Sequence, residues 1–468
     1  MHKIPTESPS AAQRMILRAS HNWRTPALLF VGIYLFSGLS RIATSFDSRW
    51  SVYIAMSLWN HGHTYLDEYP RAIFPEEYAL ECVDDAGRVR THVPACDGHW
   101  YNSYPIGGPV LETPLIVAAV EVLRAARPLL AHFHSSQPVI AGFLNADYDI
   151  AHPIIEEECA TFLLACSALM MYFIARRFLS NARAVWLALL FALATSAYSV
   201  AGRALWQHTP STLLLTIVIY LLLRSEERPA LAAWAGLPVA LAYTVRPTDA
   251  LFVLIFTAYV ALRRRAYLPG YLLAAAPVAI AFIWYNESVY HAILSPYYRT
   301  PLDGFLPRNW PRLGVGLAGN LISPSRGLFI YTPVFLFAIW SMIRRKWRAP
   351  LAPWLAALAG LHWLAVSAYI ANWWGGDSYG PRFFTDMTPV FVLFLIPYFE
   401  DWTGLTRTAR AAFLTLALIG FAIHLRGGWS PAVYEWNVKP ADIDRHPERN
   451  WDWSDPQFLR GLPPWSKE

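Results

Sequence analysis

The polar residues of this 468-residue chain are concentrated in seven short segments between apolar stretches. Aspartate, histidine, arginine, tryptophan and tyrosine recur in these segments. A carboxylate can accept a proton from a hydroxyl group, and a guanidinium can bind phosphate oxygens through two parallel hydrogen bonds. The segments therefore have the groups needed for acid–base chemistry on a phosphorylated substrate. They are residues 46–50, 101–105, 203–208, 246–249, 286–299, 323–327 and 373–382.

Four arginines in these segments are candidates for binding phosphate, because a guanidinium stays charged at any working pH. They are Arg203, Arg246, Arg326 and Arg382. His208 is a candidate for a further donor to the same phosphate. The alternative for Arg203 and Arg246 is that they extend to lipid headgroups, and the alternative for His208 is packing at the membrane interface.

The segment 373–382 is rich in glycine, which lets the backbone approach a ligand closely. We expect Asp377, Tyr379 and Arg382 from this segment, together with Tyr104, to bind substrate. A structural ion pair between Asp377 and Arg382 is the alternative.

Asp47 is the candidate general base. The apolar residues that follow it, Val52, Ala55 and Met56, share one face at helical spacing and predict an amphipathic helix on the membrane surface. Asp47 stands at the start of this helix, so a role as its N-cap is the competing interpretation.

The composition indicates an all-α polytopic membrane protein, since 55% of the residues are hydrophobic, 15% are charged and the mean hydropathy is +0.29. Arginine clusters end the apolar segments at alternate boundaries, which predicts about 11 transmembrane helices with a cytoplasmic N-terminus and an outer C-terminus. The apolar segment 105–122 is expected to lie in the outer interface, because a span there would invert every later loop. The expected spans are 26–43, 160–174, 184–200, 211–223, 231–245, 250–262, 268–285, 328–343, 351–369, 388–399 and 411–425.

This topology divides the chain into a transmembrane domain, residues 1–425, and an outer tail, residues 426–468, expected to lie over the outer surface. The domain has a long first outer loop, 44–158, with interfacial helices, and a second large outer loop, 286–326. We expect Glu156, Glu157 and Glu158 to form the solvated start of a helix. Asp249 is expected to cap the span that follows it.

The four cysteines do not form a metal-binding pattern. Cys82 and Cys96 both lie in the first outer loop, where a disulfide is possible, but the sequence alone leaves the pairing open. No zinc-site spacing and no glycine-rich phosphate loop is present. We therefore expect no metal and no nucleotide cofactor, with a divalent metal possible but unsupported. No motif for nucleic-acid recognition is present.

The order of these features resembles the GT-C membrane glycosyltransferases. A first span is followed by Asp47 at the head of an interfacial helix, a long outer loop, and the proline-containing segment 101–109 before the second span. Within that superfamily the chain is most similar to the dolichyl-phosphate-mannose protein mannosyltransferase and lipid A aminoarabinose transferase type. The segments 205–210, 323–327 and 373–382 look like an uncharacterised bacterial branch.

The resemblance implies that Asp47 is catalytic and that the chain transfers a sugar, with inversion, from a polyprenyl-phosphate carrier to a hydroxyl acceptor on a glycan, lipid or protein. It implies a bacterial inner membrane with the site facing the periplasm or cell exterior. Two departures stand out: Ser48 replaces a common second carboxylate, and lysine is absent between Lys3 and Lys346, which leaves arginine or histidine to bind phosphate. The alternative functions are a lipid-linked glycan flippase or transporter, and an O-antigen ligase or polymerase.

Overall fold

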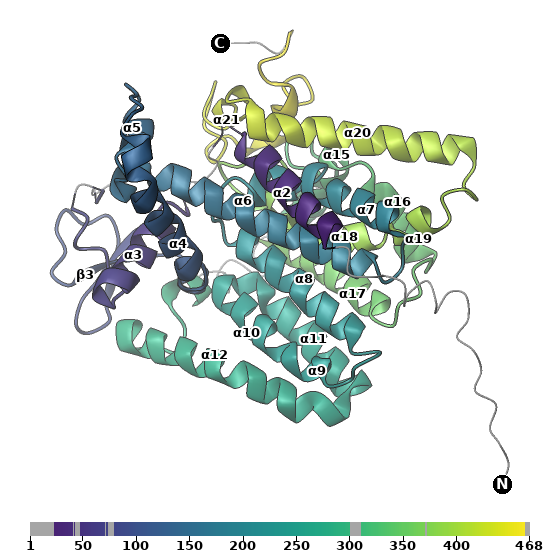
Figure 1. Ribbon diagram of the computed structural model, residues 1–468, viewed down its shortest axis with the longest axis horizontal. Helices are drawn as coiled ribbons and strands as arrows, with labels where there is room; N and C mark the ends of the chain where they lie inside the picture. Colours follow the sequence, from purple (N-terminus) through teal and green to yellow (C-terminus); the bar gives the residue numbers. More distant parts are fainter. Residues whose placement is uncertain are drawn as a thin grey trace.

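The computed structural model of the chain describes residues 23–40, 42, 47–70, 72–73, 79–299, 310–369 and 372–463. Most of these residues are helical, and the long helices pack side by side (Figure 1). The helices of the array are α2 (Arg24–Gly38), α6 (Tyr148–Ala175), α7 (Asn181–Leu193), α8 (His208–Arg224), α9 (Leu231–Trp234), α10 (Gly236–Val245), α11 (Ala250–Arg263), α12 (Leu268–Tyr290), α14 (Trp310–Ile322), α15 (Leu328–Tyr331), α16 (Phe335–Ile343), α17 (Ala352–Ala368), α18 (Thr388–Leu393), α19 (Ile396–Glu400) and α20 (Arg407–Trp429).

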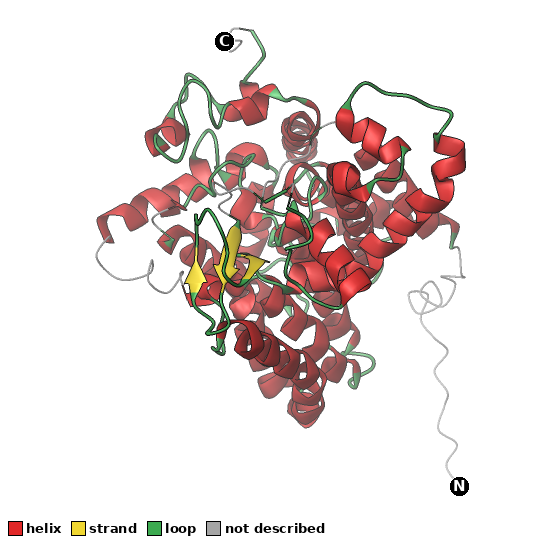
Figure 2. Ribbon diagram, turned by 90° about the vertical axis from the view of Figure 1, so that its left-hand side faces the viewer, coloured by secondary structure: helices red, strands yellow, loops and turns green. Residues whose placement is uncertain are grey.

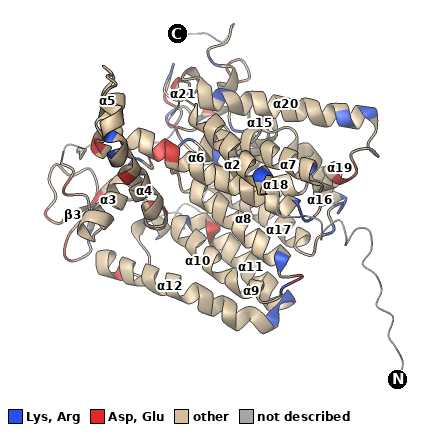
Figure 3. Ribbon diagram, in the orientation of Figure 1, with Lys and Arg blue, Asp and Glu red and all other residues tan. Residues whose placement is uncertain are grey.

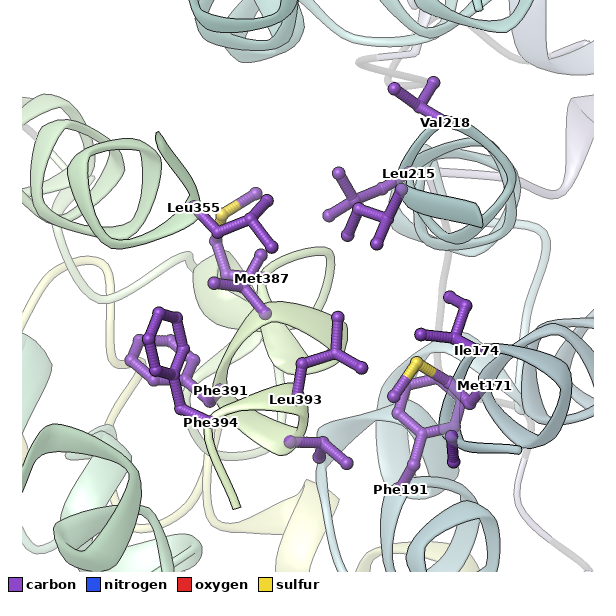
Figure 4. Close-up of a cluster of buried hydrophobic side chains, with 14 of the residues drawn as sticks. Met171, Ile174, Phe191, Leu215, Val218, Leu355, Met387, Phe391, Leu393 and Phe394 are labelled. Atoms are coloured by element: carbon purple, nitrogen blue, oxygen red, sulfur yellow. The ribbon is translucent and has the colours of Figure 1, made fainter. Parts of the chain in front are cut away.

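The centre of the array is a close-packed apolar core. Figure 4 shows Met171 and Ile174 of α6 and Phe191 of α7 on one side of it, and Leu355 of α17 with Phe391 of α18 on the other. All five side chains are buried. Since interiors of this kind are packed to crystal-like density, the core fixes the relative positions of the helix ends that carry the polar segments.

The outer faces of the array are also apolar. On α12, which lies along one edge in Figure 1, Leu273 and Trp284 are 74% and 70% exposed. A contiguous apolar face of this kind is typical of contact with lipid.

Within the described part of the chain, three helices are long and apolar enough to cross a membrane, namely residues 148–175, 265–290 and 407–429. Six further apolar helices in the same described ranges have 10 to 17 residues. Some expected spans are interrupted: 184–200 divides into α7 and the π-helix η1 (Ala197–Ala201), 328–343 into α15 and α16, and 388–399 into α18 and α19. The number of eleven spans and their orientation remain predictions.

Charged residues are distributed unevenly along the array. In Figure 3, lysine and arginine gather at one end, near α9, α19 and the start of α20, whereas acidic residues appear near α3 (Trp50–His61), α4 (Gly107–Leu130) and the start of α6. Helix α5 (Pro138–Leu144) lies beside α6 at this second end. The clustering of arginine and lysine at one end is the feature from which the cytoplasmic end was predicted.

The segment 44–158, predicted to be the first outer loop, contains a small antiparallel sheet, which the all-α prediction did not include. Strands β1 (Leu80–Val83), β2 (Val89–Arg90) and β3 (His99–Asn102) pair in the order β2-β1-β3 and are yellow in Figure 2. A disulfide joins Cys82 to Cys96, whose Cα atoms are 5.5 Å apart. The structure thus resolves the pairing that the sequence left open, and the disulfide closes a short loop within the sheet.

The acidic run at residues 156–158 is not a solvated helix start, so that expectation was wrong. Helix α6 begins two turns earlier, where the Asp147 side chain caps it by accepting a hydrogen bond from the Asp149 amide at 3.1 Å. The three glutamates then face neighbouring segments. Glu156 accepts from Ser48 Oγ, Glu157 accepts from Arg203 at 2.7 Å, and Glu158 accepts from Tyr34 at 2.6 Å.

The C-terminal segment 430–463, here called the C-terminal strap, packs into the molecule. It contains α21 (Ala432–Glu435), η7 (Pro447–Trp451) and η8 (Gln457–Leu459). Trp436, Asn450 and Gln457 in the strap are fully buried. Its side chains therefore contribute to the interior of the molecule.

Candidate active site

An open cavity of about 640 Å³ lies among the loops that join the helices. Six of the seven polar segments identified from the sequence contribute to its wall, all except 323–327, and the sheet and the C-terminal strap contribute as well. A smaller pocket of about 60 Å³ shares eight lining residues with it and extends toward α3 and α8. The shared residues are Asp47, Tyr104, Trp206, Gln207, Arg246, Tyr297, Arg382 and Phe383.

Asp47 and Arg382 form an ion pair on this shared wall. Arg382 Nη2 donates to Asp47 Oδ2 at 2.9 Å, although 335 residues separate them in the sequence. The Arg382 guanidinium also lies over the Trp206 ring, 3.8 Å from its centroid, and donates to the Gly375 carbonyl at 3.2 Å. The N-cap position of α3 is occupied by Arg49. Asp47 is therefore placed at the cavity beside a cation.

Arg246 is the second arginine that lines both the cavity and the smaller pocket, and a buried carboxylate holds its guanidinium in place. It donates to Asp386, which is fully buried. His208 Nδ1 and His362 Nε2 lie 3.8 Å and 3.9 Å from Asp386 Oδ1. The carboxylate of Asp386 thus anchors Arg246, which lines the cavity, and approaches His208, which lines the smaller pocket.

Asp386 was not among the residues selected from the sequence. The sequence did indicate that Asp386 is important, because it stands just before the apolar segment 388–399. Burying an acidic residue beside such a segment costs free energy, and residues of this kind usually have a function. Asp249 was predicted to cap α11, but its side chain makes no capping hydrogen bond. It is fully buried instead and accepts from Ser211 Oγ at 2.6 Å.

Three residues selected from the sequence line neither the cavity nor the smaller pocket. Arg203 is fully buried and bonded to Glu157 and Thr161. Arg326 is fully buried in contacts described below. Tyr379 is buried and donates to the Ile423 carbonyl at 2.7 Å. We therefore exclude Arg203, Arg326 and Tyr379 from the candidate substrate contacts, and keep Asp47, Tyr104, His208, Arg246, Asp377 and Arg382.

Further polar residues, which were not predicted from the sequence, also line the cavity. Gln207 Nε2 donates to the hydroxyl of Tyr297 at 3.2 Å, and both side chains face the cavity. Asp444 of the C-terminal strap accepts from Trp374 Nε1 at 2.8 Å and lines the cavity with Asp377. Burial raises the pKa of Asp377, and the nearby Asp444 carboxylate raises it further. The spacing of residues in the sequence gave no indication that the C-terminal strap lines the site.

Glu81 on β1 is a buried carboxyl group in the cavity wall. Its residue is 8% exposed, and its Oε2 has no hydrogen-bond partner within the described ranges. Burial raises the pKa of Glu81 from 4.5 to about 7. Between pH 4.5 and about 7, the folded protein keeps a proton on Glu81 that the unfolded chain has released. The stability contributed by the protonated Glu81 is therefore lost as pH rises through this range.

Replacement of Glu81 by glutamine is expected to stabilise the protein at pH 8 by up to about 3 kcal/mol, and to have little effect near pH 4.5, because glutamine cannot ionise. Thermal unfolding in detergent at the two pH values would measure this difference. The exposed Glu121, which pairs with Arg124 on α4, provides a matched Glu→Gln control with no expected pH-dependent change. Equal effects of Glu81→Gln at both pH values would contradict the prediction.

Among the described residues, no group of three or more histidine, cysteine, aspartate or glutamate side chains is arranged to hold a metal ion.

No protein-family model matches the chain, and no curated protein matches its sequence. Among solved structures, the chain is similar to the Archaeoglobus fulgidus oligosaccharyltransferase tethered with an acceptor peptide, with a TM-score of 0.42 and 12% identity. The match covers 92% of this chain and 59% of that chain. The chain thus spans less than two thirds of the length of that protein chain.

Proposed function

We propose that this protein is a membrane glycosyltransferase that moves a sugar from a polyprenyl-phosphate carrier to a hydroxyl acceptor. The observation that supports this most directly is the placement of Asp47 beside Arg382, at 2.9 Å, in a cavity that Arg246 also lines. One carboxylate and two guanidinium groups are thereby within reach of one substrate. Transfer from a phosphate carrier needs this combination of a base and cations.

In the proposed reaction the acceptor oxygen attacks the anomeric carbon of the sugar. Asp47 takes the proton of the acceptor hydroxyl as the new carbon–oxygen bond forms. The bond between the anomeric carbon and the phosphate oxygen breaks, and its electron pair leaves with the phosphate. Arg382 and Arg246 stabilise the charge that develops on that oxygen. A single displacement of this kind inverts the anomeric configuration.

In this mechanism, binding of the donor would break the ion pair between Asp47 and Arg382. A guanidinium paired with one carboxylate can exchange it for a phosphate, which offers more oxygen acceptors. The donor phosphate would then hold Arg382 and release Asp47 to act as base. The Trp206 ring supports the Arg382 guanidinium during this exchange, because the cation lies 3.8 Å from the ring centroid.

We place the reaction at the outer face of a bacterial inner membrane, facing the periplasm or cell exterior. The apolar helix faces support a location in lipid, and the acceptor is a glycan, lipid or protein hydroxyl. The proposed donor lipid would lie against the helix array with its phosphate in the cavity. No divalent metal is required by the proposed steps.

A transporter for a lipid-linked glycan is the second candidate, and one observation favours it. Arg246, Asp249 and Asp386 are buried at helix ends, and α15–α16 and α18–α19 are interrupted. Buried ionisable groups with broken helices are common in transport pathways. The transferase is preferred because Asp47, Arg382 and Arg246 converge on one cavity.

Replacement of Arg382 by lysine is expected to reduce kcat/KM for the lipid donor by about 10-fold or more. Lysine keeps the charge but loses the two-pronged hydrogen bonding and the stacking on Trp206. Steady-state transfer at varied concentrations of a labelled polyprenyl-phosphate sugar would measure it. Arg88→Lys is the matched control, since Arg88 lies in the first outer loop and its ion pair with Asp84 is exposed. Unchanged donor kinetics in Arg382→Lys would contradict a phosphate-binding role.

A further inference from the structure

Arg326 is a buried cation that uses every nitrogen of its guanidinium within the protein. Its Nε donates to the Trp374 carbonyl at 2.9 Å, and its Nη2 donates to the Gly376 carbonyl at 3.1 Å. Its Nη1 donates to Gln457 Oε1 at 2.5 Å. Arg326 thus joins the glycine-rich segment to the C-terminal strap.

Gln457 has a similarly complete set of contacts and is fully buried. Its Oε1 also accepts from the Gly380 amide at 3.2 Å, and its Nε2 donates to the Ser378 carbonyl at 2.8 Å and the Val433 carbonyl at 2.9 Å. Asn437 Oδ1 accepts from both Arg326 and Gln457, at 2.9 Å and 3.2 Å. These three side chains form a connected polar cluster.

The segment held by this cluster, residues 374–380, leads directly into Arg382. Gly375, Gly376 and Gly380 have φ values of 78°, 63° and 62°, which glycine adopts without the strain that other residues incur. The cluster contacts four backbone groups of the segment. Gly375 in turn accepts from Arg382, and Asp377 lines the cavity.

We infer that Arg326 and Gln457 are positioning residues, which hold the glycine-rich segment so that Arg382 and Asp377 face the substrate cavity. Neither side chain touches the cavity, so both act through the segment. Fully satisfied buried polar networks of this kind make one local structure strongly preferred. The inference rests on the proposed transfer activity for its kinetic consequence, but its structural part can be tested separately.

The test uses the full-length protein in detergent and the variant Gln457→Met, which keeps the side-chain length but loses the hydrogen bonds. Hydrogen exchange of the segment 375–382 should become about tenfold faster or more, because several buried backbone groups lose partners. The KM for a labelled polyprenyl-phosphate sugar should rise about tenfold or more, while the KM for the acceptor stays unchanged. A general loss of folded protein would lower the apparent kcat and leave both KM values unchanged.

Matched variants make the test specific. Arg460→Gln removes another buried, ion-paired side chain of the C-terminal strap, which bonds to Asp455 at 2.9 Å, and should leave exchange of the segment unchanged. Asn437→Asp keeps the acceptor oxygen and should behave like wild type. If Gln457→Met fails to fold, Gln457→Glu keeps the contact to Arg326 but loses the donor to Ser378, and faster exchange is again expected.

Unchanged exchange of the segment would overturn the inference, as would faster exchange with wild-type donor kinetics. If the wild-type protein transfers no sugar, the proposed function fails, and the exchange experiment still decides whether the cluster holds the segment.

Discussion

Replacement of Asp47 by asparagine is expected to reduce the rate of sugar transfer by about 10²- to 10⁴-fold, the usual contribution of a general base. Asparagine has the same shape as aspartate and can still accept a hydrogen bond from Arg382, but it cannot take a proton from the acceptor hydroxyl. The loss should therefore appear mainly in kcat. Single-turnover measurement with a labelled polyprenyl-phosphate sugar and purified protein would separate this step from donor binding.

Asp85→Asn is the control for this experiment, because Asp85 is an exposed aspartate in the same outer loop. It should transfer sugar at the wild-type rate. Equal amounts of folded protein in the membrane must be confirmed for both variants. Wild-type turnover in Asp47→Asn would show that Asp47 has only a structural role in the outer loop.

The second large effect is expected from Asp386→Ala, which removes the buried partner of Arg246. An uncompensated charge at this position is expected to destabilise the protein by about 3–5 kcal/mol. Both side chains are at least 94% shielded from solvent, so water cannot replace the lost carboxylate. Thermal unfolding in detergent would record the loss as a marked decrease in Tm, together with reduced transfer.

A double variant tests the cause of this destabilisation. Arg246→Met combined with Asp386→Leu removes both charges and should recover most of the stability, since an apolar pair of similar volume is often as stable as a buried ion pair. Transfer should remain impaired, because Arg246 lines the cavity. Recovery of activity with stability would show that Arg246 does not contact the substrate.

Part of the site could be predicted from the sequence because the relevant residues interrupt apolar segments. Asp47, Arg246 and Arg382 are separated by up to 335 residues, yet each stands at the end of an apolar segment, and such ends gather on one side of a helical array. The charge pattern thus identified the segments that meet. It gave no information on which side chains point into the cavity.

Arg326 shows why the charge pattern does not reveal which side chains point into the cavity. Arg326 has the same local signal as Arg382, but its guanidinium is fully occupied by Trp374, Gly376 and Gln457. Those partners lie 48 to 131 residues away, so no local pattern could show that the cation is satisfied internally.

The small sheet was missed for a different reason. Its strands have only two to four residues, and such short strands have little periodicity from which they could be recognised. Glu81, on β1, was missed with it.

The most direct test of the central proposal is an assay in proteoliposomes with a labelled polyprenyl-phosphate sugar and a mixture of hydroxyl acceptors. It follows two products separately: sugar bound covalently to an acceptor, and intact donor moved to the other leaflet. The transferase proposal predicts acceptor-bound sugar and free polyprenyl phosphate with the wild-type protein, and neither with Asp47→Asn. Movement of intact donor across the bilayer without any transferred sugar, unaffected by Asp47→Asn, would contradict it and support the transporter.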